Sequence, residues 1–338
     1  MVRILTYNVN RCIGDDGGYD PARVGVAIRR SCCDIVCIQQ VEVNKVFRQQ
    51  RRDSAEHADN QPQLLARVSG LPNISFGGPL AAYLGEPARQ DGMRPDPFGE
   101  VLVRDAEKRC AVGNAILSKY EILSARNLVF EQESPPMSDQ VIYIDRESQP
   151  RGARAVLVDI GAPEVPERGG HTLSTMAGCC RTASQDELRR AVARGHMIRP
   201  LWVVSVQLSN KVSSNEQRSQ AQQLLRWVDS LAAEVEGTAR PGVIVCGDIG
   251  SWPFAPNSSY GILSSAPGWK ATAACCSAAT FPASCYAPCG LRLDHVFVLD
   301  RYDLARVEIK SVRVLVSDEA EASDHLPVLV DFDVRQPR

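Results

Sequence analysis

The sequence has no uninterrupted apolar run of about 18 residues, the length that a membrane-spanning helix needs. It also lacks a typical secretion signal, because the opening MVRILTYNVN contains one basic residue and no long apolar stretch before a cleavage site. Neither sign of charge prevails, since 38 basic residues stand against 40 acidic ones. This balance argues against strong unspecific binding to nucleic acid or to an acidic membrane surface. We therefore expect a cytoplasmic or otherwise intracellular protein without a membrane span.

Cysteine is not scarce, but a disulfide framework is not expected. Without a secretion signal, the 12 cysteines indicate reduced thiols. Cys275, Cys276, Cys285 and Cys289 lie close together in the sequence, with His295 beyond them. Their spacing matches no standard zinc pattern, so we do not expect a zinc site there.

Apolar segments of strand length recur along the chain. Helices are indicated where apolar residues recur at helical spacing, as Leu224, Val228 and Leu231 do. Asp20 and Pro21 predict the start of another helix, because Asp is a good N-cap and proline is favoured at the first position. Strands outnumber helices, which favours an α/β fold of two packed sheets with helices outside. We expect strands over 2–9, 34–41, 113–120, 121–130, 153–160, 201–208, 242–248, 291–299, 305–316 and 325–332, and helices over 21–30, near 62–70 and over 215–235.

Polar side chains stand at the ends of several of these apolar strands. A single Asp in such a place has a simple explanation as a turn former. Several polar side chains at strand ends in one chain favour a shared site instead. Burying a carboxylate costs free energy unless the carboxylate is paired or binds a cation. Oxygen ligands of this kind suit Mg²⁺ or Mn²⁺ rather than Zn²⁺. The residues are Asn8, Gln40, Glu42, Asp248, Asp294, Asp324 and His325.

Seven short motifs occur along the chain. Each motif alone is a weak signal, but together and in this order they are specific for one protein family. They are TYNVN, GDDGGYDP, IQQVE, GNAILS, CGDIGSWP, LDHVFV and SDHLPV, and with the strands that carry the first and the last of them they reach from residue 2 to residue 332. In this set the sequence resembles the endonuclease/exonuclease/phosphatase superfamily, which includes deoxyribonuclease-like nucleases, sphingomyelinases and inositol polyphosphate phosphatases. The resemblance implies an α/β fold that is a four-layer α/β/β/α sandwich of two mostly antiparallel sheets. We expect a single domain over 1–338, with insertions at 85–110, 131–150 and 161–199.

The resemblance also implies a reaction and a role for each motif residue. An activated water would hydrolyse a phosphate ester with the help of Mg²⁺ or Mn²⁺. Asp248 would align or deprotonate that water, His325 would stabilise the phosphoryl oxygens, and Asp294 would orient the histidine. The metal residues carried over are Asn8, Gln40, Glu42 and Asp324, and the substrate-binding residues are Asn114, Trp252 and Arg151. A packing role for the tryptophan and a solvated loop position for the arginine are open alternatives.

Three positions depart from the family pattern. Gln40 stands where the family has a metal-binding Glu, Gly250 stands where it has Asn, and Gln207 stands where it commonly has His. An amide in place of a carboxylate lowers the affinity for Mg²⁺. Glu42 is a candidate substitute, because a strand period of two places it on the same side, about 6–7 Å further along.

Two hypotheses about function therefore stay open. The chain is a divalent-metal-dependent hydrolase of phosphate esters with weakened activity, or it is an inactive relative that acts as a binding or scaffold protein. Asp248, Asp294, Asp324 and His325 favour the first, whereas Gln40 and Gly250 favour the second. The substrate class is open among lipid-related, nucleotide and nucleic-acid phosphate esters, and protein partners are unknown.

Overall fold

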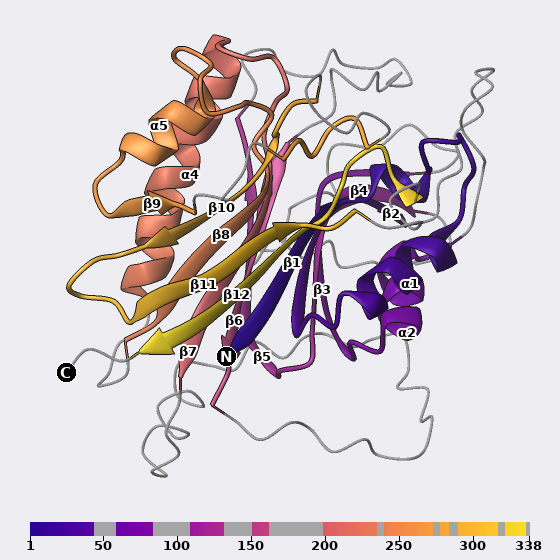
Figure 1. Cartoon of the computed structure of the whole chain (residues 1–338), viewed down its shortest axis with the longest axis horizontal. Helices are drawn as coiled ribbons and strands as arrows, with labels where there is room; N and C mark the ends of the chain where they lie inside the picture. The colour runs from indigo at the N-terminus through magenta and orange to yellow at the C-terminus, as the bar shows by residue number, and fades with distance from the viewer. Residues whose placement is uncertain are drawn as a thin grey trace.

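Two six-stranded sheets pack face to face, with helices on both outer sides (Figure 1). The computed structural model describes residues 1–43, 59–83, 109–131, 151–161, 199–234, 240–272, 278–283, 290–316 and 322–335. The first sheet contains β1 (Val2–Asn8), β2 (Ile35–Val43), β3 (Asn73–Tyr83), β4 (Arg109–Ser118), β11 (Arg306–Val314) and β12 (Val328–Arg335). The second contains β5 (Ile122–Val129), β6 (Gly152–Asp159), β7 (Pro200–Gln207), β8 (Gly242–Asp248), β9 (Trp269–Ala271) and β10 (Asp294–Leu299).

The strand order confirms the expected α/β sandwich. The first sheet runs β11-β12-β1-β2-β4-β3 and the second runs β5-β6-β7-β8-β10-β9. Within each sheet one neighbouring pair is parallel, β1 with β2 and β7 with β8, and the other described pairs are antiparallel. The two sheets are therefore mostly antiparallel, as the resemblance implies.

Each sheet has two apolar faces, which produces the four layers. In β1, Ile4 joins a buried cluster between the sheets, whereas Leu5 and Tyr7 belong to a second cluster on the opposite face. That second cluster includes side chains of α1 (Pro21–Arg30) and α2 (Gln61–Ser69). A third cluster joins the outer face of the second sheet to α4 (Asn215–Ala233) and α5 (Ser259–Ser265). Figure 1 shows these helix pairs on opposite sides of the sandwich.

Local signals account for the helix starts. The Asp20 side chain accepts the backbone N–H of Arg23 at 3.0 Å, and Pro21 is the first residue of α1, as predicted. Ser214 caps α4 in the same way by accepting the N–H of Gln217 at 3.0 Å. Among the described residues, no helix is long and apolar enough to cross a membrane.

The sequence did not predict β3, β9 or α5. β3 contains a Gly77–Gly78–Pro79 run that is typical of a turn, and its pairing with β4 shifts register between Gly77 and Leu80. The loop expected over 85–110 ends too late, since β4 begins at Arg109. The rest of that segment and nearly all of the insertions expected at 131–150 and 161–199 lie outside the described residues.

Candidate functional site

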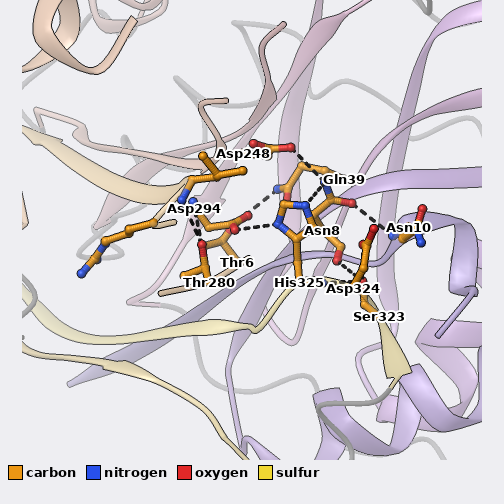
Figure 2. Close-up of polar contacts among 12 residues, drawn as sticks. Thr6, Asn8, Asn10, Gln39, Asp248, Thr280, Asp294, Ser323, Asp324 and His325 are labelled. Carbon is orange, nitrogen blue, oxygen red and sulfur yellow. Dashed lines mark hydrogen bonds and ion pairs between the residues drawn. The ribbon is translucent and has the colours of Figure 1, made fainter. Parts of the chain in front are cut away.

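Four predicted site residues from distant parts of the chain meet at one edge of the sandwich (Figure 2). The Asn8 amide nitrogen donates to Asp248 Oδ2 at 3.0 Å and lies 3.4 Å from His325 Nε2. On the other side of the ring, His325 Nδ1 is 2.8 Å from Asp294 Oδ2. All four side chains are buried. The structure thus forms a continuous chain of contacts from Asp248 through Asn8 and His325 to Asp294.

Strand register explains how these side chains meet. In the second sheet, Gly152, Gln207, Asp248 and Asp294 form one row across β6, β7, β8 and β10. In the first sheet, Asn8 ends β1 opposite Gln39 of β2. The row and the end of β1 face each other across the sandwich, so the site requires both sheets.

Two hydroxyl groups that the sequence did not single out hold the cluster in place. Ser323 Oγ donates to the Asn8 carbonyl oxygen at 2.7 Å and accepts the backbone N–H of His325 at 3.2 Å. Thr280 Oγ1 accepts the backbone N–H of Asp294 at 3.2 Å. Ser323 adjoins the Asp-His motif, which was a usable signal, whereas the sequence around Thr280 carried none.

Burial and neighbouring charges set the protonation of the site. Burial raises the pKa of Asp248, and the positive charge of His325 opposes that effect. Burial lowers the pKa of His325, but the carboxylates of Asp294, Asp248 and Asp324 outweigh it and raise the pKa to about 9. A pKa raised in this way favours the protonated form of His325 at neutral pH. Asp324, the residue before it, adds to this effect through its charge.

A bulge changes the expected geometry of β2. The pairing with β4 shifts between Ile38 and Val41, and Gln40 in that gap has a φ of 58°. The strand period of two, which the prediction used to place Gln40 and Glu42 on the same side, does not hold across this bulge. Gln39 points toward the second sheet and donates to Ser205 Oγ at 3.0 Å.

The donors predicted for Mg²⁺ or Mn²⁺ have other partners. The Glu42 carboxylate lies 3.3 Å from Arg11 Nε, and Asn8 Oδ1 accepts the backbone N–H of Asn10 at 3.1 Å. The bulge residue Gln40 contributes an amide without charge. Among the described residues, no three acidic, histidine or cysteine side chains converge on a point that could hold a metal ion. The residues therefore do not fit a tight, preformed divalent site.

The three predicted substrate residues lie in different surroundings. Asn114 of β4 donates to the Gly152 carbonyl oxygen at 2.8 Å and so links the two sheets beside the site. Arg151 is only 6% exposed, which excludes the solvated loop position. Burial lowers its pKa, and the negative charge of Asp248 opposes this effect. Trp252 is half-buried in the turn after β8, where its carbonyl oxygen accepts the N–H of Ala255 at 3.1 Å.

The backbone explains the glycine at position 250. Gly250 has a φ of 65°, and a Cβ added there would lie 2.4 Å from the Ser209 carbonyl oxygen. Its N–H donates to Asp248 Oδ1 at 2.9 Å, so this backbone position orients the carboxylate. The family asparagine could not stand here without moving the chain.

A groove of about 610 Å³ lies elsewhere, between β9–β10 and β11. Val298 and Asp300 line it at the opposite end of β10 from Asp294. It contains none of the predicted site residues and has no part in the site.

Comparisons with known proteins agree with the fold. The family model described as "Endonuclease/Exonuclease/phosphatase family" matches residues 5–325. An endonuclease/exonuclease/phosphatase from Beutenbergia cavernae is 16% identical, with a TM-score of 0.60 over 99% of this chain and 72% of that one. A protein of the same description from Bacteroides vulgatus is 16% identical, with a TM-score of 0.59 over 99% of both chains.

The human Nocturnin catalytic domain, solved with a bound sulfate anion, is 13% identical, with a TM-score of 0.52 over 98% of this chain and 93% of that one. None of the curated proteins matches the chain. At these identities the solved structures establish the fold alone. The family model, however, covers nearly the whole sequence. The chain therefore belongs to the endonuclease/exonuclease/phosphatase family.

Proposed function

We propose that this chain hydrolyses phosphate esters, as a phosphodiesterase or phosphatase of weakened activity. The family includes metal-dependent enzymes of both kinds. The observation that carries the proposal is the buried chain of contacts from Asp248 through Asn8 and His325 to Asp294. Buried ionisable groups with shifted pKa values, such as Asp248 and His325, are typical of catalytic sites.

The cationic state of His325 supports a phosphate ligand. Because Asn8 Oδ1 accepts an N–H of the backbone, the amide presents its NH₂ group to the imidazole. A protonated Nε2–H cannot donate to an NH₂ group, so it needs another acceptor. A phosphoryl oxygen supplies one, and its charge is complementary. Asp294, on Nδ1, fixes the ring in this orientation.

Asp248 is the proposed residue that aligns or deprotonates the attacking water. Its two oxygens accept from the Asn8 amide and the Gly250 N–H, which fixes the carboxylate without neutralising it. A carboxylate whose pKa is raised by burial is a better general base near neutral pH than an exposed one.

Mg²⁺ or Mn²⁺ is the cofactor that family membership implies. Gln40 offers no charge and Glu42 is paired with Arg11, so we propose that this chain holds such an ion weakly.

The test is hydrolysis of bis-p-nitrophenyl phosphate and of p-nitrophenyl phosphate, in Mg²⁺, in Mn²⁺ and in EDTA. We expect slow turnover by the native chain and a loss of about 10²-fold or more in Asp248→Asn, which keeps the shape of the side chain. Lys270→Gln, in the groove remote from the site, serves as the control and should keep full turnover. Equal rates in the native chain and in Asp248→Asn would show that this site does not catalyse.

A binding protein without turnover is the second candidate, and Gly250 favours it. The group that would position the nucleophile is missing, and the backbone leaves no room for it. Gln40→Glu is the informative restoration, because it adds a carboxylate at the bulge without touching position 250. Turnover that appears only in Gln40→Glu, with Mg²⁺, would establish the native chain as a binding protein.

A further inference from the structure

His295 follows Asp294 in the LDHVFV motif, but its side chain points to the opposite face of β10. Successive residues of a strand alternate between the two faces of the sheet. The His295 ring packs against Tyr260 of α5, with the ring centroids 4.6 Å apart, and the residue is only 3% exposed. His295 therefore lies behind the site rather than in it, and the proposed function leaves it without a role.

One nitrogen of this ring contacts carbonyl oxygens from two different segments. His295 Nε2 lies 3.0 Å from the Ser251 carbonyl oxygen and 2.9 Å from the Arg292 carbonyl oxygen. Because carbonyl oxygens only accept hydrogen bonds, Nε2 must carry a proton. Burial lowers the pKa of His295 to about 4, which favours the neutral ring at neutral pH. The imidazole is therefore a neutral donor, and it shares its Nε2–H between the two carbonyl groups.

The two carbonyl groups belong to the segments that adjoin the carboxylates of the site. Ser251 lies in the turn that follows Asp248 at the end of β8, and Arg292 comes shortly before Asp294 at the start of β10. Asp248 and Asp294 are paired in register across these two strands. The shared N–H of His295 thus ties the chain that leaves one carboxylate to the chain that enters the other.

The turn that contains Ser251 also fixes the direction of the Asp248 carboxylate. Gly250, the residue before Ser251, donates its N–H to Asp248 Oδ1 at 2.9 Å. A glycine has no side chain that restricts its backbone, so the direction of this N–H depends on contacts with other residues. Gln217 Nε2 of α4 holds the Gly250 carbonyl oxygen at 3.0 Å, and His295 holds the next carbonyl oxygen along the chain.

We propose that His295 is a positioning residue for the reaction, because its Nε2–H fixes the turn whose Gly250 N–H orients the Asp248 carboxylate. This inference rests on the proposed function, in which Asp248 aligns or deprotonates the attacking water. Packing alone is the competing explanation, since an aromatic ring without an N–H would also fill the space beside Tyr260. The two explanations differ in the part of the His295 side chain that matters, the donor or the ring.

Two substitutions separate the donor from the ring. His295→Phe keeps an aromatic ring and removes the donor, whereas His295→Gln keeps an N–H near the position of Nε2 and removes the ring. With bis-p-nitrophenyl phosphate and Mg²⁺, kcat should fall about tenfold in His295→Phe, while KM stays within about twofold. In His295→Gln, kcat should stay within about threefold of the native value. Tyr260→Leu is the matched control, because it removes the packing partner and should lower stability without changing kcat.

Hydrogen exchange at the Gly250 amide tests the same geometry without turnover. Loss of the hydrogen bond to Ser251 should speed this exchange about five- to tenfold in His295→Phe. Exchange should stay near the native rate in His295→Gln and in Tyr260→Leu. If His295→Phe does not fold, His295→Leu replaces it as the variant without a donor.

Equal exchange at Gly250 in the native chain and in His295→Phe would overturn the proposal. So would a His295→Gln variant that loses as much as His295→Phe, because the ring would then be the part that matters. Native turnover that is undiminished in His295→Phe defeats this inference and leaves the hydrolase standing. The expected exchange pattern in a chain without turnover leaves the hold of His295 on the turn standing and defeats the hydrolase.

Discussion

Single residues at this site are constrained more by backbone than by side-chain chemistry. Gly250 has a left-handed backbone and lies against the Ser209 carbonyl oxygen, so this backbone leaves no room for the asparagine of the family pattern. His325 is constrained differently, because it is buried among three acidic groups that keep it charged. The backbone conformation of Gly250 and the charged surroundings of His325 each lead to a prediction about stability.

Gly250→Ala should destabilise the fold by about 1–3 kcal/mol, because a Cβ there meets the backbone and the left-handed φ is unfavourable. Urea denaturation measures the effect. Gly261→Ala is the control, since that glycine lies in α5 and a Cβ would be 3.7 Å from the nearest neighbour, Ser258 Oγ. That change should be neutral or stabilising. Equal effects of the two substitutions would contradict the strain argument.

The raised pKa of His325 makes its contribution to stability depend on pH. In the unfolded chain an ordinary histidine has a pKa near 6.5, and in the folded protein the value is about 9. The folded state binds the proton more tightly, so the stabilisation is full below about 6.5 and is lost as the pH rises through about 9. The unfolding free energies of the native chain and of His325→Gln should therefore converge between those values. A gap that stays constant from pH 6 to pH 10 contradicts the assignment.

At the scale of elements, the sequence predicted regular segments well and irregular ones poorly. The range of α1 and its Asp20 cap follow from composition and spacing, because capping is local chemistry. The bulge at Gln40 and the left-handed turn at Arg11 do not, because contacts with other elements hold them. The Glu42–Arg11 pair escaped prediction for the same reason. The irregular segments position Gln40 and Arg11, whereas the regular strands β8 and β10 carry Asp248 and Asp294.

Gln61 connects three elements and should be sensitive to substitution. Its side chain donates to the Arg11 carbonyl oxygen and accepts the Glu42 N–H at 2.8 Å, so α2 holds both the turn after β1 and the end of β2. Gln61→Leu leaves two buried backbone groups without these partners and should cost about 2–4 kcal/mol of unfolding free energy. Gln63→Leu, on the exposed side of the same helix, should change stability by less than about 0.5 kcal/mol. Hydrogen exchange at the Glu42 amide should quicken only in Gln61→Leu.

At the scale of the whole molecule, the two sheets depend on each other. Their inner faces form one buried cluster, and the site takes Asn8 from the first sheet and Asp248 from the second. The ordered motifs sufficed to predict the sandwich and the meeting of these strand ends. They did not predict Ser323 or Thr280, whose hydroxyl groups act on backbone that only the fold brings near. The intracellular location stays a prediction.

The shared core predicts that both sheets unfold in one step. The four tryptophans, Trp202, Trp227, Trp252 and Trp269, all belong to the half that contains the second sheet. Tryptophan fluorescence therefore reports on that half, whereas far-UV circular dichroism reports on both. The two urea transitions should coincide. An earlier transition by either probe would indicate that one sheet unfolds separately.

The pairing of β1 with β12 has a consequence for synthesis on the ribosome. Among the described strands, β1 comes first in the sequence and β12, its neighbour on one side, comes after all the others, and the amino group of Met1 lies 3.1 Å from Asp333 of β12. A nascent chain must therefore keep one edge of β1 open until β12 has emerged from the ribosome. Products truncated before Val328 would expose that edge to pairing between chains and should be prone to aggregate.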